Sequence, residues 1–133
     1  MEHLFLLGDE AIALAAVDSG ISGAYSYPGT PATEIMEYVQ KIKGNYNQTI
    51  RSEWSANEKT AFEEALGMSF MGRRALVSMK HVGLNVAADV LMNGAITGVN
   101  GGLVLVSADD PSMHSSQNEQ DSRFYGKFSF IPV

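Results

Sequence analysis

The stretch from Ser55 to Asn85, SANEKTAFEEALGMSFMGRRALVSMKHVGLN, contains the pattern that decides the fold. Its first part, Ser55 through Met71, predicts a helix with one apolar side, and Gly72 ends that helix. The apolar run Ala75–Met79 predicts a buried strand, and a second helix is expected from Val82 to Thr97. A strand with a helix before and after it is typical of parallel β-sheets, because parallel neighbours need a crossover connection.

The rest of the chain repeats this alternation of helical and strand patterns. We expect helices over Gly8–Ser19, from Pro31 to about Ile42 and over Ser115–Tyr125, and strands over Gly23–Tyr27, Gln48–Trp54, Leu103–Ser107 and from near Phe128. Thr30 is expected to cap the helix that begins at Pro31. The predicted fold class is α/β, a three-layer, doubly wound parallel sheet with helices on both faces, formed by one domain over residues 1–133.

Composition excludes several kinds of chemistry. The 133 residues carry a formal net charge of −6 and no cysteine. Without cysteine, the chain has no disulfide, thiolate zinc site, cysteine nucleophile or iron–sulfur ligand of its own. The acidic balance makes nucleic acid a poor partner, and no apolar stretch approaches the ~20 residues of a membrane span. Residues 1–7 lack the basic region and cleavage site of a signal peptide, so we expect a cytoplasmic domain.

The end of the sequence has an unusual composition for the end of a domain. Residues 128–133, FSFIPV, form an apolar run, whereas domains usually end in a polar or frayed segment. We therefore expect this domain to be incomplete at its C-terminus and to come from a longer protein.

The turns that follow the strands are the expected place of a functional site, because ligands of open parallel sheets bind outside the carboxyl ends of the strands. Tyr27–Pro31, with two prolines and Gly29, predicts either a rigid corner that a ligand approaches or only a strand exit. In Lys80–Asn85, Lys80 and His81 are candidates to bind a carboxylate or phosphate, unless this is only an exposed, capped helix start. No carboxylate or second histidine stands at metal-ligand spacing from His81, so a zinc site is not expected.

Glu58 has two possible roles at the start of the long helix. Ser55 and Glu58 have the spacing of a capping box, in which the two side chains satisfy free amides of the first turn. Glu58 also begins the apolar stripe of its helix, whereas Glu63 and Glu64 should face water. The stripe continues through Ala61, Phe62, Ala65 and Ser69. An inward carboxyl group at this edge of the sheet suits proton exchange with a ligand, and the sequence leaves both roles open.

A long polar loop follows the strand Leu103–Ser107. Residues 107–121 contain few apolar side chains, and long polar loops in compact domains are often functional. Asp109 and Asp110 form an acidic pair, which by itself is a weak signal for magnesium, and the alternative is a solvated loop. The chain lacks a dinucleotide-binding Gly-x-Gly-x-x-Gly after a strand, a phosphate-binding Gly-x-x-x-x-Gly-Lys motif and a Gly-x-Ser-x-Gly elbow.

Together these turns resemble the pyrimidine-binding domain of thiamin-diphosphate enzymes. The pattern consists of Asn57-Glu58-x-x-Ala61, the small residues Ala65 and Gly67, Gly72-Arg73-x-Ala75-Leu76-Val77 and Gly83-Leu84-Asn85. Three segments are more specifically similar to the α subunit of indolepyruvate:ferredoxin oxidoreductases, namely Tyr27–Pro31, Met79–Asp89 and Ser107–Asp121. The resemblance extends from about Gly8 to the last residue.

The resemblance implies a role for each turn. Glu58 stands where the family's glutamate bonds the N1′ atom of the aminopyrimidine, and it is the catalytic residue that the resemblance implies. The implied cofactor-binding residues are Tyr27, Pro28, Gly29, Thr30, Glu58, Lys80, His81, Gly83, Leu84 and Asn85. Candidate contacts to a neighbouring domain or subunit are His114, Ser115, Gln117 and Asn118.

The resemblance also implies an activity, oxidative decarboxylation of aryl pyruvates to acyl-coenzyme A, with electrons passing to ferredoxin. The implied cofactors are thiamin diphosphate with Mg²⁺, and iron–sulfur clusters elsewhere in the enzyme. The implied partners are a diphosphate-binding domain, a β subunit, ferredoxin, the 2-oxoacid and coenzyme A, in an oligomer. The family holds the diphosphate and metal with a Gly-Asp-Gly…Asn-Asn signature that this chain lacks, so we expect no metal ligands and no activity from this chain alone.

Two alternatives remain open. The same type of domain occurs in non-oxidative thiamin-diphosphate decarboxylases of phosphono- or sulfo-oxo acids, and cysteine clusters outside this chain would favour the oxidoreductase instead. The other alternative is a non-catalytic interaction module, or a fragment that dimerises through an exposed sheet edge. Binding of thiamin diphosphate only together with a diphosphate-binding partner would separate a half-site from such a module.

Overall fold

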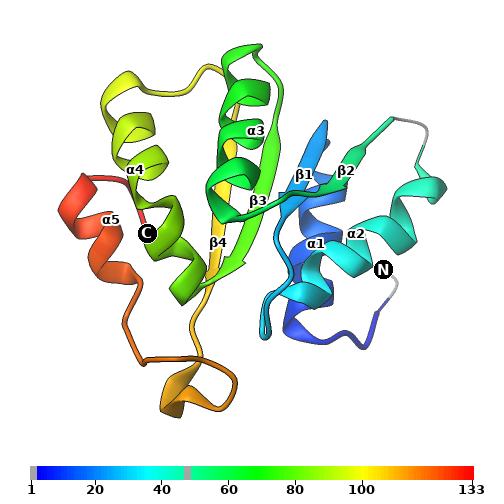
Figure 1. Cartoon of the computed structure of the whole chain (residues 1–133). Coiled ribbons are helices and arrows are strands. Elements are labelled where there is room, and N and C mark those ends of the chain that lie inside the picture. Colours follow the sequence, from blue (N-terminus) through cyan, green and yellow to red (C-terminus); the bar gives the residue numbers. More distant parts are fainter. Residues whose placement is uncertain (1–2, 47–48) are drawn as a thin grey trace.

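A four-stranded parallel sheet lies at the centre of the computed structural model, which describes residues 3–46 and 49–133 (Figure 1). The strands are β1 (Gly23–Ser26), β2 (Arg51–Trp54), β3 (Ala75–Lys80) and β4 (Leu103–Ala108). Their order is β2-β1-β3-β4, and every pairing is parallel. The carboxyl ends therefore meet at one edge of the sheet, where Ser26 is opposite both Trp54 and Ser78, and Lys80 is opposite Ala108.

Helices cover both faces of the sheet (Figure 1). The helices are α1 (Gly8–Asp18), α2 (Thr33–Ile42), α3 (Glu58–Phe70), α4 (His81–Thr97) and α5 (Arg123–Ser129), with short 3-10 turns at Lys43–Asn45 and Pro111–Met113. α1 and α2 pack together on one face, α3 and α4 on the other, and α5 lies beside α4. The predicted α/β class, with a doubly wound parallel sheet, is confirmed.

Two hydrophobic cores lie on the two faces of the sheet. Tyr25 and Val77 belong to the core under α3 and α4, whereas their neighbours Ala24 and Leu76 belong to the core under α1 and α2. This division follows from the two-residue period of a strand. The central strands β1 and β3 are buried on both faces, which explains the continuous apolar run predicted as the strand Ala75–Met79.

Several predicted boundaries need adjustment. The strand predicted over Gln48–Trp54 is found over Arg51–Trp54, and Gln48 lies outside the described residues, as do Met1, Glu2 and Asn47.

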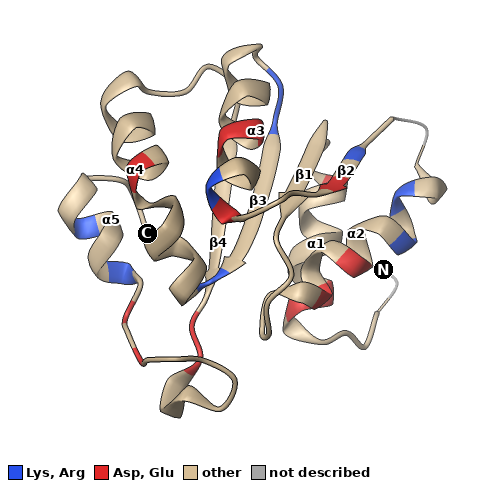
Figure 2. Cartoon of the chain, viewed as in Figure 1, with Lys and Arg blue, Asp and Glu red and all other residues tan. Residues whose placement is uncertain are grey.

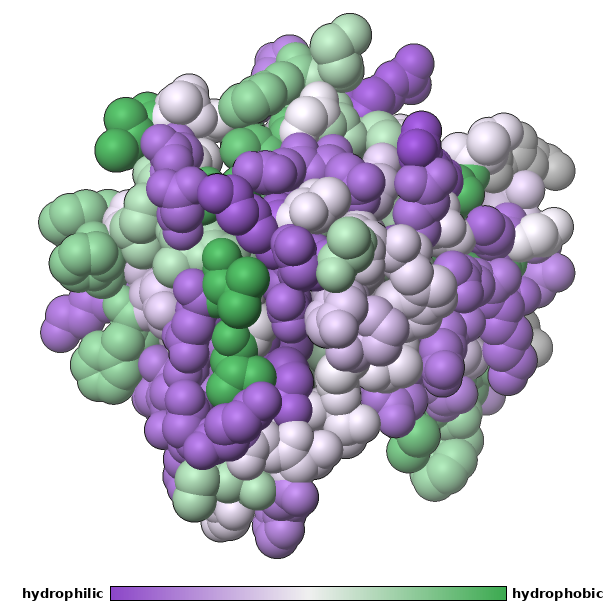
Figure 3. Space-filling view, viewed as in Figure 1, coloured by the Kyte–Doolittle hydropathy of each residue, from purple (hydrophilic) through white to green (hydrophobic). Residues whose placement is uncertain are grey.

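On the face seen in Figure 3, apolar side chains lie in separate groups among hydrophilic ones. Within the described part of the chain, no helix has the length and apolar character needed to cross a membrane.

The helix after β1 begins later than predicted. Thr30 does not cap it, because α2 starts at Thr33 and a turn precedes it. The Ala32 amide donates to the Gly29 carbonyl at 2.9 Å, and the Gly29 amide donates to the Thr33 hydroxyl at 2.9 Å. The peptide bond between Thr30 and Pro31 is cis. The hydroxyl that shapes this corner is therefore that of Thr33.

The predictions for the C-terminal segment are wrong in two places. The helix predicted over Ser115–Tyr125 is found only in its last three residues, because residues 114–118 form turns and bends, 119–122 are not helical and α5 begins at Arg123. Serine, asparagine and aspartate bond nearby backbone groups and so compete with helical hydrogen bonds. No strand begins near Phe128, which lies in α5 with its side chain 75% exposed. The alternating sequence imitates a strand, but here it has no sheet to pack against.

Two adjacent glycines before β4 provide a test of the packing. A β-carbon on Gly101 would collide with the backbone of Arg73, whereas one on Gly102 would meet its nearest atom, Cγ of Arg74, at 3.7 Å. We predict that Gly101→Ala destabilises the chain by about 1–3 kcal/mol, the usual cost of overpacking, in urea unfolding. Gly102→Ala should remain within about 0.5 kcal/mol of the parent. Equal stability of the two variants would contradict this packing.

Candidate functional site

The residues singled out from the sequence gather at the carboxyl edge of the sheet. Tyr27–Thr30 follows β1, Glu58 begins the helix after β2, and Lys80 ends β3. His81, Gly83, Leu84 and Asn85 lie in the first turns of α4. Because β1 and β3 are neighbours, the segments after them meet at the middle of this edge.

Glu58 is not engaged in capping. The predicted capping box of Ser55 and Glu58 is wrong, because Asn57 caps α3 by accepting from the Thr60 amide at 2.9 Å. The Ser55 hydroxyl instead donates to Glu64 at 2.6 Å, so Glu64 is not fully in water as predicted. A short asparagine immediately before the first helical residue reaches the free amides more directly. Glu58 accepts no hydrogen bond from any described residue, so its carboxyl group is available to a ligand.

The Glu58 side chain occupies the space beside Gly83, the third residue of α4. A β-carbon built on Gly83 would lie 2.6 Å from Oε1 and 2.8 Å from Cδ of Glu58. Gly83 is buried and Glu58 is half-buried, so the carboxyl group is held between the starts of two helices. Lys59 and Asp89 form an ion pair at 3.1 Å that joins the same two helices next to Glu58. The predicted stripe below Glu58 is confirmed, since Ala61, Phe62, Ala65 and Ser69 are all buried.

The Lys80 side chain lies over Gly29, much as the Glu58 side chain lies beside Gly83. A β-carbon on Gly29 would lie 2.9 Å from Cδ and 3.3 Å from Cγ of Lys80, so the glycine makes room for the lysine stem. The Lys80 ammonium donates to the Ser115 carbonyl. The Tyr27 ring beside this corner is 40% exposed, and Pro28 and Thr30 are exposed as well. The first turn is thus an open corner whose inner side is the Lys80 stem.

His81 is fully buried and binds the loop that follows β4. Its Nε2 lies 2.8 Å from the Asn118 carbonyl, so Nε2 carries the hydrogen, because a carbonyl only accepts. Nδ1 is buried and has no hydrogen-bond partner among the described residues. Gln120 adds a second link, donating to the His81 carbonyl at 3.0 Å. These bonds fix the loop on the start of α4.

Asn85 and Leu84 also have partners within the chain. The Asn85 amide donates to Gln120 at 3.0 Å, and its oxygen accepts from the Tyr125 hydroxyl at 2.7 Å. Leu84 is part of the core beneath α4. Sequence reasoning missed Gln120 and Tyr125. No motif marks them, because they are 35 and 40 residues from Asn85 in the sequence and meet it only in the folded chain. That Lys80, His81, Leu84 and Asn85 contact a cofactor stays a prediction.

The acidic pair after β4 shapes the loop. Asp110 is buried and accepts from the Ser115 amide at 2.8 Å and the Ser116 hydroxyl at 2.7 Å, while Asp109 accepts from the Ser122 amide at 2.9 Å. Over residues 3–46 and 49–133, no group of three histidine, cysteine, aspartate or glutamate residues could hold a metal ion. The predicted contact residues of this loop, His114, Ser115, Gln117 and Asn118, are exposed.

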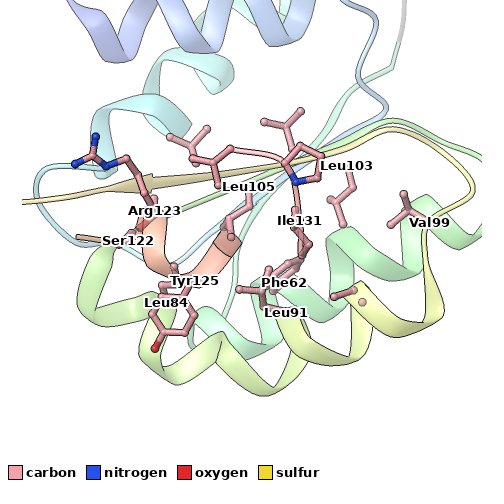
Figure 4. Close-up of a pocket in the computed structure, with 18 of the residues that line it drawn as sticks. Phe62, Leu84, Leu91, Val99, Leu103, Leu105, Ser122, Arg123, Tyr125 and Ile131 are labelled. Carbon is pink, nitrogen blue, oxygen red and sulfur yellow. Dashed lines mark hydrogen bonds between the residues drawn. The ribbon is translucent and has the colours of Figure 1, made fainter. Parts of the chain in front are cut away.

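A cavity of about 760 Å³ lies beside β4 (Figure 4). Its lining is mainly apolar and comes from α3, α4, β4 and the last residues of the chain, including Phe62, Leu91, Leu105 and Ile131. Of the residues predicted to bind the cofactor, only Leu84 lines it. The cavity reaches the carboxyl end of β4 at Ser107 and Asp109 but shares only Leu84 with the predicted cofactor-binding residues.

Comparison with solved structures places the fold in a class. The chain superposes with a TM-score of 0.72 on a 2-oxoglutarate:ferredoxin oxidoreductase from Magnetococcus marinus, a structure with 2-oxoglutarate, coenzyme A and succinyl-CoA bound. The match has 23% identity and covers 90% of this chain and 21% of that one. At this identity the likeness concerns the fold, which is that of part of a 2-oxoacid:ferredoxin oxidoreductase.

Curated relatives are more similar in sequence. The chain is 54% identical to indolepyruvate oxidoreductase subunit IorA of Archaeoglobus fulgidus, 50% to that of Methanothermobacter marburgensis and 51% to that of Pyrococcus abyssi. Each match covers 99% of this chain, and the chain spans about a fifth of the length of these relatives. No model of a protein family matches the chain. The predicted resemblance to a subunit of indolepyruvate:ferredoxin oxidoreductases is confirmed.

The loop after β4 should respond to acid through Asp110. Hydrogen bonds from the Ser115 amide and the Ser116 hydroxyl lower the Asp110 pKa below 3.8, against an opposing effect of burial. The stabilisation is therefore fully present above pH 3.8 and is lost as the pH falls through the lower pKa of the folded state. We predict that the Ser115 amide resonance titrates with a midpoint below 3.8.

Asp110→Asn should abolish this titration and increase hydrogen exchange in the loop at neutral pH. Glu119→Gln, which changes an exposed carboxylate of the same loop, is the control and should preserve the low midpoint. A midpoint at or above 3.8 in the parent chain would contradict the assigned hydrogen bonds.

Proposed function

We propose that this chain is the part of a thiamin-diphosphate-dependent 2-oxoacid:ferredoxin oxidoreductase that binds the aminopyrimidine of the cofactor, with Glu58 as its catalytic residue. The observation that carries the proposal is the half-buried Glu58 carboxyl group, which lies against Gly83 and accepts no hydrogen bond within the described part of the chain. The similarity to IorA over 99% of the chain supports this choice of reaction.

The residues at this edge fit one half of the cofactor. A carboxyl group fixed between two helix starts suits a planar ring nitrogen that exchanges a proton, and Tyr27 to Thr30 would line the thiazolium and substrate side. No described cluster suits a metal ion, and Asp110 is already bonded to its own loop. The proposal therefore assigns the diphosphate and its Mg²⁺ to another domain.

Glu58 would hold or exchange a proton at the N1′ atom of the aminopyrimidine. Its position does not depend on its own hydrogen bonds, since Asn57 caps the helix and Lys59 ties α3 to α4 through Asp89. Holding the carboxyl group in one place reduces the entropic cost of proton transfer. When bound, thiamin diphosphate supplies the carbon chemistry at the carbonyl of the 2-oxoacid.

The identity of the substrate and of the partners forms the finer part of the proposal. The relatives are indolepyruvate oxidoreductase subunits, which supports an aryl pyruvate as substrate. We propose a β subunit, ferredoxin as electron acceptor and coenzyme A as acyl acceptor. This chain has no cysteine, so the iron–sulfur clusters would be ligated elsewhere in the enzyme.

Glu58 variants test the proposal in the full-length enzyme. We predict that Glu58→Gln and Glu58→Ala lower indolepyruvate-dependent electron transfer by about 100-fold or more, the size of a lost acid–base contribution. Thermal unfolding should stay within a few degrees of the parent. Glu63→Gln, on an exposed position of the same helix, is the control and should retain full turnover. Near-normal turnover of both Glu58 variants would refute the proposal.

Gly83 provides a second test, because it separates folding from function. Alanine there should displace the flexible Glu58 side chain, while the helix gains about 0.5–1 kcal/mol from replacing glycine. We predict near-parental stability and at least tenfold lower turnover for Gly83→Ala. The matched control is Gly94→Ala in the same helix, where a β-carbon would meet Leu66 at an ordinary 3.7 Å. Similar turnover of the two variants would contradict the role of the Glu58–Gly83 contact.

A further inference from the structure

We infer that Lys80 binds the carboxylate of the 2-oxoacid beside Glu58, an inference that rests on the proposed function. The juxtaposition that supports it is the Lys80 stem packed over Gly29, at the end of a central strand and immediately before the helix that contacts Glu58. The anchored substrate would thus have its negative group at Lys80 and its reacting carbonyl toward the Glu58 side of the edge.

The position of Lys80 is well defined. It is the last residue of β3, opposite Ala108 of β4, and β3 lies between β1 and β4. Gly29 holds its stem from one side, since a β-carbon there would lie 2.9 Å from Cδ. The Ser115 carbonyl binds its ammonium from the other side. The ammonium is therefore held between the first turn and the loop after β4.

Lys80 has no anionic partner among the residues that the structure describes. The ion pairs of the described residues are Arg51–Glu53, Lys59–Asp89 and Arg123–Asp121, and none includes Lys80. An ammonium has three N–H donors, and the Ser115 carbonyl takes one of them. Two N–H donors therefore remain for a ligand, and an anion suits both their charge and their hydrogen-bonding capacity.

Lys80 is the only lysine or arginine in the residues 27–32, 55–57, 80–85 and 109–122 at the carboxyl ends of the strands. The four carboxylates of the last segment, Asp109, Asp110, Glu119 and Asp121, each have a partner within their own loop or at the first residue of α5. α1, α2 and α3 each have an acidic residue in the first turn, but α4, which begins directly after Lys80, has none (Figure 2). α4 thus has no acidic residue of its own in its first turn, and the carboxyl group beside its start is that of Glu58 from α3.

Three anionic groups share this chemistry: the 2-oxoacid carboxylate, the phosphates of coenzyme A and the diphosphate of the cofactor. The carboxylate is the group attached directly to the reacting carbonyl. Lys80 precedes Gly83, the glycine against which Glu58 lies, by less than one helical turn, so both charged residues approach the same end of α4. We therefore assign the 2-oxoacid carboxylate to Lys80.

The test uses Lys80→Met, which keeps the length of the stem and removes the charge, in the full-length enzyme. We expect the KM for indolepyruvate to rise about 10- to 100-fold, as for loss of a charge-assisted hydrogen bond. The KM for coenzyme A and the affinity for thiamin diphosphate, measured by isothermal titration, should change less than about twofold. Lys80→Arg, which keeps the charge, should restore part of the indolepyruvate affinity.

Gly29→Ala tests the position of the stem without removing the charge. It should raise the KM for indolepyruvate, whereas Gly44→Ala, where a β-carbon meets no atom within 4 Å, should leave it unchanged. An unchanged KM for indolepyruvate in Lys80→Met would overturn the inference. A change confined to the KM for coenzyme A or to the affinity for thiamin diphosphate would overturn it as well. In both cases, loss of turnover in Glu58→Gln would still uphold the proposed function. Normal turnover of Glu58→Gln would overturn both.

Discussion

The approach of α4 to Glu58 depends on a missing β-carbon at Gly83. Any larger residue would place an atom where Oε1 and Cδ of Glu58 now lie, 2.6 and 2.8 Å from the β-carbon position. The rest of the edge is built around this contact. Parallel pairing of β1 and β3 brings their ends together, α3 and α4 pack side by side on one face, and Lys59 and Asp89 tie their starts. The sheet thus sets the spacing between the starts of α3 and α4, and Gly83 leaves room between them for the Glu58 carboxyl group.

A second glycine has the same function for a group of opposite charge. Gly29 makes room for the Lys80 stem as Gly83 makes room for Glu58, and no ion pair joins the two side chains in the described structure. If Lys80 and Glu58 formed an ion pair, each charge would neutralise the other, and both groups would bind a charged ligand more weakly. Glycine at both positions lets charged side chains be held by packing of their stems. Their polar ends then remain available.

Much of the fold and the main site residues were predictable from sequence, for identifiable reasons. The apolar run Ala75–Met79 and the stripe of α3 depend on local periodicity, and the Glu58 and Gly83 positions belong to a motif. The contact between Glu58 and Gly83 was not predictable, because it depends on how two helices pack. Capping was misassigned because Asn57 and Ser55 are both good caps, and their competition is decided by backbone geometry.

The loop after β4 explains why side-chain chemistry alone is a poor guide to this edge. The backbone carbonyls of Ser115 and Asn118 bind the Lys80 and His81 side chains, so the sequence of the loop contains no sign of these two bonds. His81 Nε2 and the Asn85 amide consequently donate within the chain, whereas the Glu58 carboxylate accepts from no described donor and the Lys80 ammonium uses one of its three donors. Glu58 and Lys80 therefore keep hydrogen-bonding capacity on charged groups at the edge of the sheet, whereas the capacity that His81 keeps is at its buried Nδ1.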